Sequence, residues 1–140
     1  MPFWDSSAIV PLCCWQPGTS ESRRLRRETG RIIVWWGTTV ESRSALARLA
    51  KDGHLTTAAH RQTITRLSQL RLAWDEILPS EKVRSLAEEL PDRYGVRAAD
   101  AFQLAAALVW AREQPRQRAF VAFDERLRAA AATLGFSVRP

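Results

Sequence analysis

Short apolar runs and longer amphipathic stretches alternate along the whole chain. The short runs are apolar at nearly every position, which is typical of strands buried on both faces of a parallel sheet. They predict strands at PFW (2–4), RIIVWW (31–36) and AFVAF (119–123), with weaker candidates at DEIL (75–78) and FSV (136–138).

The longer stretches repeat apolar residues with the period of an amphipathic helix, about 3.6 residues. They predict helices over 19–29, 38–53, 56–73, 80–90, 98–114 and 124–135. The fourth helix should end before Pro91, because proline lacks the N–H that a helix interior uses, and the last should end at Gly135. Strands that alternate with helices predict an α/β fold with a mostly parallel sheet, formed by one domain over residues 1–140.

The stretch FWDSSAIVPL (3–12) places the carboxylate of Asp5 inside an otherwise apolar segment. Folding alone does not require this, because an unpaired charge in such surroundings is costly. Glu41, Asp100 and Asp124 also lie in apolar surroundings, where a strand ends or a helix begins. In a parallel sheet these positions meet at one edge, where ligands bind. We therefore expect the four carboxylates to converge.

Each of these acids also has a purely structural interpretation. Asp5 could form an Asx-turn with the serines that follow it, and Asp124 could be the N-cap of the last helix. Thr38 and Glu41 match a capping box, and the helix dipole favours an acid at Asp100. These interpretations stay open for each acid alone. Four independent caps, however, need not fall at one edge of one sheet.

Converging carboxylates need a compensating charge. Two carboxylates ~4 Å apart repel each other by about 4 kcal/mol at an effective dielectric constant of roughly 20. A hard divalent cation relieves this repulsion, and a set of oxygen ligands suits Mg²⁺ or Mn²⁺. Such a site in a basic protein predicts hydrolysis of phosphodiester bonds, in which the ion activates a water and stabilises the charged transition state.

The net charge of +6 arises from 21 Lys and Arg against 15 Asp and Glu, and every basic residue except Lys51 and Lys82 is an arginine. The guanidinium fork matches phosphate oxygens, so this bias suits a protein that binds nucleic acid. A GC-rich genome would favour arginine equally well. The charge therefore agrees with nucleic-acid binding but does not decide for it.

Four segments resemble the acidic motifs of PIN-domain ribonucleases, in particular those of VapC-like toxins from bacterial toxin–antitoxin pairs. These segments are FWDSSAIVPL, TTVESRSALARL, VRAADAFQLAAAL and FVAFDERLRAAAATLGFSV. The resemblance runs in order over nearly the whole chain, and the first and third motifs are the more specific. It implies a three-layer α/β/α sandwich and cleavage of RNA that depends on Mg²⁺ or Mn²⁺. It also implies inhibition by a small cognate antitoxin, and a homodimer.

The resemblance assigns roles by position. Asp5, Glu41 and Asp100 correspond to the core metal-binding and catalytic acids of the family, and Asp124 corresponds to its more variable fourth acid. Ser6 corresponds to a small hydroxyl residue beside the first acid, which would position a water on the metal or a phosphate of the substrate.

The chain departs from the family pattern at two positions. Ala122 stands where the family often has Thr or Ser, and Gln103 stands where it often has His. Both changes alter the expected positioning of the substrate, and neither removes a metal ligand. A PIN-like fold that acts only as a catalytically inactive protein-binding module is the alternative. Loss of a core acid would indicate that module, and because all are present we favour the enzyme.

Other α/β enzymes with acids at strand ends fit this sequence less well. A response-regulator receiver domain needs a lysine at a late strand end, where neither Lys51 nor Lys82 lies. A haloacid-dehalogenase-type phosphatase needs a second Asp two residues after the first, where this chain has Ser7. A serine hydrolase is disfavoured because the sequence contains no G-x-S-x-G motif.

Cys13 and Cys14 are adjacent and have no other cysteine to pair with, which predicts buried thiols in a reducing compartment. The longest run without a polar residue, LAAALVWA (104–111), is far shorter than the ~18 residues of a membrane span. The N-terminus lacks the basic region of a signal peptide. These features predict a cytoplasmic protein with no membrane partner.

Two further features could contact RNA. The arginine-rich segment ESRRLRR (21–27) is either a contact surface for RNA or antitoxin, or a solvated helix face, and both interpretations stay open. Trp15 is expected in the loop after the first strand, where its ring could stack on a base. Trp4, Trp74 and Trp110 are expected in the core.

Overall fold

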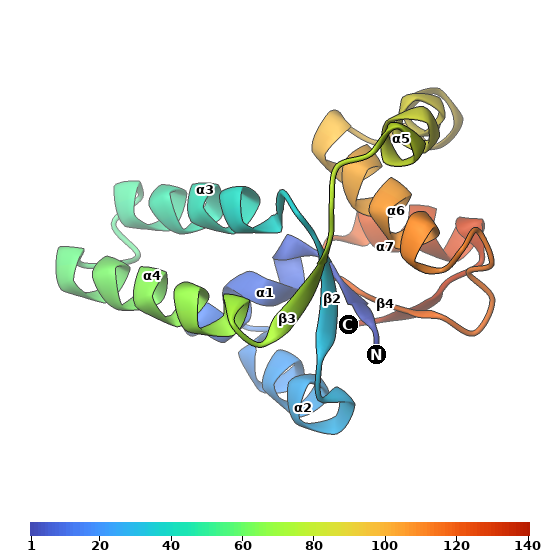
Figure 1. Cartoon of the computed structure of the whole chain (residues 1–140). Helices are drawn as coiled ribbons and strands as arrows, with labels where there is room; N and C mark the ends of the chain where they lie inside the picture. The colour runs from blue at the N-terminus through green and yellow to red at the C-terminus, as the bar shows by residue number, and fades with distance from the viewer.

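A computed structural model describes all residues, 1–140, and has a five-stranded sheet at its centre (Figure 1). The strands are β1 (Phe3–Trp4), β2 (Ile32–Trp35), β3 (Trp74–Ile77), β4 (Ala119–Val121) and β5 (Ser137–Arg139). They lie in the order β3-β2-β1-β4-β5, and every neighbouring pair is parallel. All five predicted strands are present, and β1 lies in the middle of the sheet.

Seven helices cover the two faces of this sheet. They are α1 (Ser6–Cys13), α2 (Thr19–Thr29), α3 (Thr38–Lys51), α4 (Thr57–Arg71), α5 (Glu81–Tyr94), α6 (Ala98–Trp110) and α7 (Glu125–Leu134). Helices α1 to α4 pack against one face and α5 to α7 against the other, so they lie on opposite sides of the sheet in Figure 1. The predicted α/β/α sandwich is confirmed.

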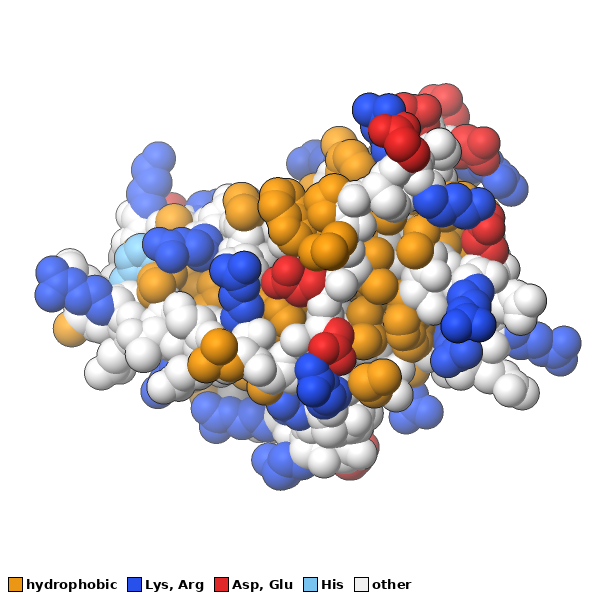
Figure 2. Space-filling view, viewed as in Figure 1, with side chains coloured by type: hydrophobic (Ala, Val, Ile, Leu, Met, Phe, Trp, Pro, Cys, Tyr) orange, Lys and Arg blue, Asp and Glu red, His pale blue; other side chains and the backbone are white.

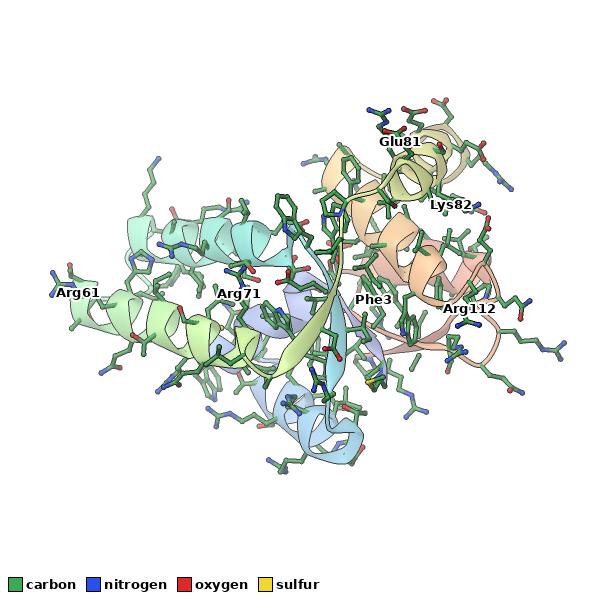
Figure 3. The ribbon with its side chains drawn as sticks, viewed as in Figure 1. Phe3, Arg61, Arg71, Glu81, Lys82 and Arg112 are labelled. Carbon is green, nitrogen blue, oxygen red and sulfur yellow. The ribbon has the colours of Figure 1, made fainter.

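Side chains that alternate along the strands divide the core into two clusters. Phe3 faces the α5–α7 layer, where its ring stacks on Phe120 with 5.5 Å between centroids. Trp4 faces the opposite layer, and both side chains are fully buried. Figure 3 shows Phe3 near the middle of the molecule, while Arg61 and Arg112 project outward. Asp5 therefore directly follows a strand whose side chains are fully buried.

The sequence did not predict α1. Most of its residues are buried in the structure. In the sequence the segment is therefore apolar on nearly every side, and it does not show the alternation of apolar and polar residues that marks an amphipathic helix. Pro11 lies inside it, and the β-branched Ile9 and Val10 favour strands, so the local signals oppose a helix. The helix forms because Asp5 caps its first turn and its apolar residues pack against the sheet.

The prediction that a helix ends before Pro91 is wrong, because α5 continues to Tyr94. Pro91 lies in the last turn, where its missing N–H removes a single bond from the helix. Leu90 and Tyr94 pack against the core on either side of it, which offsets that loss. The helix ends where Gly95 adopts a left-handed φ of 65° and donates its N–H to the carbonyl of Pro91.

The helix predicted to reach residue 114 is shorter, because α6 ends at Trp110. Arg112 and Glu113 adopt left-handed φ angles of 53° and 55°, which stop the helix. Gln114 precedes a proline, a position that also disfavours helix. The periodicity of the sequence carried no signal for these two backbone conformations.

Several smaller predictions are confirmed. Cys13 and Cys14 are buried free thiols. Trp4 and Trp74 are buried as predicted, whereas Trp110 is only partly buried. Trp15 is 77% exposed in the loop after α1. No helix of the chain is both long enough and apolar enough to cross a membrane.

Candidate functional site

The four acids singled out in the sequence line a single cavity of about 840 Å³. Asp5 follows β1, and Glu41 lies in the first turn of α3. Asp100 lies in the first turn of α6, and Asp124 follows β4 and precedes α7. Every one of these positions is at the end of a strand or the start of a helix. The parallel sheet therefore brings the four carboxylates to one edge, as the sequence led us to expect.

Asp5 is almost completely buried, with 3% of its surface exposed. Its Oδ2 accepts the N–H of Ser7 at 2.9 Å and so caps α1, which confirms the expected turn. The pKa of Asp5 is raised from 3.8 to about 6, because burial and, to a smaller degree, the charge of Asp100 raise it more than the bonds from Ser7 lower it. The carboxylate is held in place but has no basic partner.

Glu41 is held by one donor on each carboxylate oxygen. Ser6 Oγ donates to Oε2 at 3.1 Å, and Gln103 Nε2 donates to Oε1 at 3.3 Å. The pKa of Glu41 is raised from 4.5 to about 7, mainly by burial and also by the charge of Asp5. The capping-box interpretation is wrong, because Thr38 Oγ1 accepts from Gln103 and the N-cap residue is Gly37.

Asp100 has no protein partner. Its carboxylate takes part in none of the hydrogen bonds or ion pairs of the structure, unlike those of Asp5 and Glu41. Burial raises its pKa, Asp124 raises it further, and Arg97 lowers it. Of the four acids, Asp100 therefore has the weakest structural reason for its position.

Asp124 is the N-cap of α7, as the structural interpretation predicted. Its Oδ1 accepts the N–H of Leu127 at 2.8 Å, while the residue also lines the cavity. A carboxylate has two oxygens and about four acceptor positions, so one capping bond leaves room for other ligands. Capping the helix and facing the cavity are therefore compatible roles.

Two serines at the start of α1 connect these elements. Ser6 donates to Glu41, and its expected role toward the substrate stays a prediction. Ser7 was not predicted: its Oγ accepts the N–H of Phe123 at 2.9 Å and that of Asp124 at 3.4 Å. The sequence held no signal for this contact, because the two segments lie more than a hundred residues apart.

The arrangement of donors fits a hydrated divalent ion. No group of three or more Asp, Glu, His or Cys side chains is gathered tightly enough to hold an ion directly. Instead the acids surround a shared cavity, and Mg²⁺ commonly binds through one or two carboxylates while keeping several waters. The cavity offers oxygen ligands and several carboxylates without a basic partner, so a cation would supply the missing positive charge.

Most of the unpartnered buried polar atoms belong to residues that are close to the acids in sequence. Five buried side-chain atoms in the structure have no hydrogen-bond partner. Four of them belong to residues within three positions of Asp5, Glu41 or Asp100: Trp4, Thr39, Ser42 and Gln103. Folding tends to satisfy buried polar groups, so such a concentration is expected at a functional site rather than in a core.

The cavity also extends along α3 beyond the acids. Its wall there includes Gln16, Ser44, Arg48 and Asp52. Arg48 is the one basic residue of the wall, and it is exposed and makes no ion pair. The cavity therefore contains one positively charged side chain, which pairs with none of the carboxylates.

The chain is similar to several proteins of known structure. VapC20 of Mycobacterium tuberculosis, described as a toxin that cleaves the sarcin-ricin loop, has a TM-score of 0.68 at 18% identity, over 93% of this chain and 95% of that one. FitAcB of Neisseria gonorrhoeae has a TM-score of 0.66 at 19% identity, over 100% and 97%. A toxin–antitoxin complex from Klebsiella pneumoniae has a TM-score of 0.64 at 13% identity, over 89% and 87%. At these identities the likeness establishes a shared fold.

No curated protein sequence matches the chain significantly. The family model described as the PIN domain does match, over residues 3–133. The match spans almost the whole sandwich and includes all four acids of the cavity. The chain therefore belongs to the PIN-domain family.

Proposed function

We propose that this protein is a divalent-metal-dependent endoribonuclease and the toxin of a toxin–antitoxin pair. The observation that carries the proposal is the convergence of Asp5, Glu41, Asp100 and Asp124 on one cavity without a basic partner that neutralises them. Proteins of the PIN-domain family are generally nucleases, and one structural relative is described as a toxin that cleaves the sarcin-ricin loop.

The four acids would hold Mg²⁺ or Mn²⁺, which when bound supplies an activated water and positive charge for the phosphoryl transition state. Ser6 and Gln103 each donate a hydrogen bond to one oxygen of the Glu41 carboxylate. Asp5 lines the cavity and is fixed by its capping bond to Ser7, which leaves its other oxygen free to bind an ion. The protein thus contributes preorganised oxygen ligands.

The substrate strand would extend from the acids along α3. Arg48 lies in the wall of the cavity and would bind a backbone phosphate. Trp15 is exposed next to Gln16, which also lines the cavity, so its ring is available to stack on an unpaired base. Basic side chains are spread over much of the visible surface in Figure 2, which suits a polyanionic partner.

Two measurements on the purified chain, free of any partner protein, test this function. Calorimetry should detect binding of Mn²⁺, and cleavage sites should appear on total cellular RNA only when Mn²⁺ is present. Asp100→Asn should weaken the binding of Mn²⁺ and lower the cleavage of RNA by about 100-fold or more. Failure to bind either ion at millimolar concentration would exclude the metal enzyme. Binding of the ion without cleavage would instead favour the protein-binding module.

A partner protein would mask this cavity in the cell. One structural relative is described as a toxin–antitoxin complex, and a metal nuclease acting on RNA in the cytoplasm would need such control. We expect the C-terminal segment of a small antitoxin to pack near residues 19–29 and 38–70 and to present a basic side chain to the acids. Expression of the chain alone should arrest growth. Harmless expression of a protein that cleaves RNA when purified would rule out a toxin.

We also expect a homodimer. Trp36, Val40 and Leu78 are 52%, 70% and 62% exposed, and Figure 2 shows apolar side chains gathered around the upper end of β3. Exposed apolar clusters of this kind often mark protein interfaces. Sedimentation should give a dimer for the wild type and a monomer for Trp36→Glu. A wild-type monomer at all concentrations would contradict the expectation.

A further inference from the structure

Gln103 is a polar residue in a place that favours an apolar one. It lies in the middle of α6, its side chain is fully buried, and its neighbours in the helix are mostly alanine and leucine. Burial of an amide is unfavourable unless its groups are hydrogen-bonded. Its Oε1 has no partner in the structure, so the amide is only half satisfied. An apolar side chain of similar volume would suit the packing of α6 better.

The other end of the amide reaches across to α3. Gln103 Nε2 donates to Thr38 Oγ1 at 3.0 Å and to Glu41 Oε1 at 3.3 Å. Ser6 donates to the second oxygen of Glu41, from α1. The carboxylate of Glu41 is therefore held between two donors that come from different helices, and these two bonds restrict its orientation.

We propose that Gln103 is a positioning residue for metal binding, which orients the carboxylate of Glu41 toward the ion. The inference rests on the proposed function, because it assumes that the cavity binds Mg²⁺ or Mn²⁺. Hydrogen bonds from such outer residues fix the direction of a ligand, and their loss commonly weakens metal binding by roughly 10- to 100-fold. This role would explain why a half-satisfied amide, and not an apolar side chain, lies in the middle of α6.

The test compares two substitutions that break different bonds of the same amide. Gln103→Met keeps the length of the side chain and removes the donor to Glu41. Thr38→Val removes only the acceptor on α3 and leaves the bond to Glu41 intact. The affinity for Mn²⁺ is measured by calorimetry, and unfolding by urea is followed in chelator.

We expect Gln103→Met to weaken Mn²⁺ binding roughly 10- to 100-fold, with little change in the urea midpoint measured in chelator. Thr38→Val should bind Mn²⁺ within about twofold of the wild type. The cleavage assay should show the same order, with Gln103→Met needing more Mn²⁺ for half-maximal activity. This pattern would support a positioning role.

Three results would overturn it. Gln103→Met could bind Mn²⁺ as tightly as the wild type, or Thr38→Val could lose as much affinity, which would make Gln103 a plain tie between α6 and α3. Gln103→Met and Gln103→Leu could both unfold at much lower urea concentration, which would make the amide a packing residue. A wild type that binds no Mn²⁺ would contradict the proposed function itself, a result distinct from these three.

Discussion

A carboxylate that caps a helix uses one oxygen and keeps the other. Asp5 accepts the capping bond through Oδ2 and Asp124 through Oδ1, and both residues still line the cavity. The structural and functional interpretations of these residues are therefore both compatible with the geometry. Asp100 differs, because it has neither a cap nor a partner, and substitutions at these residues can separate stability from chemistry.

Asp100→Asn keeps the shape of the side chain and removes its charge. In chelator we expect a free energy of unfolding equal to or above that of the wild type, because the charge is disfavoured by burial and by Asp124. Cleavage of RNA in Mn²⁺ should fall by about 100-fold or more, since a ligand matters more than its outer partners. Asp92→Asn, on the exposed side of α5, is the matched control and should change neither quantity. A variant that is less stable and still cleaves RNA would make Asp100 a helix-start residue only.

Asp124→Ser separates the two roles of the fourth acid. Serine is as good an N-cap as aspartate, so the free energy of unfolding should stay within roughly 0.5 kcal/mol of the wild type, whereas Asp124→Ala should lose about 1 kcal/mol. Both variants lose the carboxylate and should bind Mn²⁺ more weakly by a similar factor. Urea unfolding and calorimetry measure the two effects. Unchanged Mn²⁺ affinity in both variants would limit Asp124 to capping α7.

At the scale of elements, α3 joins the acids to the rest of the cavity. Glu41 lies in its first turn, and Arg48 follows seven residues later on the same face, about 10 Å along the helix axis. One rigid helix therefore sets the spacing between a proposed metal ligand and a proposed phosphate contact. A substitution at the far end of this helix is expected to change the binding of the RNA strand rather than the rate of the chemical step.

Arg48→Gln should raise KM for RNA about tenfold and leave kcat nearly unchanged, because a charge-assisted hydrogen bond to one phosphate is lost. The salt dependence of binding should weaken by about one phosphate contact. Arg43→Gln lies on the same helix, is exposed and does not line the cavity, so it should behave like the wild type. Equal KM values for the two variants would contradict a path along α3.

At the scale of the whole molecule, the buried carboxylates couple stability to pH. The pKa of Asp5 is raised from 3.8 to about 6, and that of Glu41 from 4.5 to about 7. At a pH between the ordinary and the raised pKa of each carboxyl, the folded chain binds more protons than the unfolded chain. The free energy of unfolding of the metal-free protein should therefore fall as the pH rises through this range.

Urea unfolding in chelator at about pH 5 and about pH 8 measures this effect. Asp5 alone should lower the free energy of unfolding by about 1.4 kcal/mol between the two conditions, because slightly less than half of the effect of its pKa difference falls in that window. Asp5→Asn can still cap α1, so it should show a pH dependence smaller by that amount. Identical pH dependence in the two proteins would show that Asp5 is not buried as a charge.

The fold was largely predictable because its signals are local. Apolar runs and helical periods depend on neighbouring residues, so all five strands and six of the seven helices follow from the sequence. The exceptions depend on packing. Helix α1 lies where local preferences oppose it, and α5 continues through Pro91 because Leu90 and Tyr94 contact the core. Contacts with distant residues decided these two elements.

The candidate site divides in the same way. The sequence by itself was enough to identify the four acids as candidate site residues, because a carboxylate in an apolar segment is unfavourable wherever that segment packs. Only the tertiary structure decided that Ser7 joins α1 to the β4–α7 loop and that Gln103 reaches Glu41. The residues that these bonds join are 62 and 116 positions apart in the sequence, and the parallel sheet brings them together. Local chemistry thus identified the candidate ligands, and the strand order decided that they meet at one edge of the sheet.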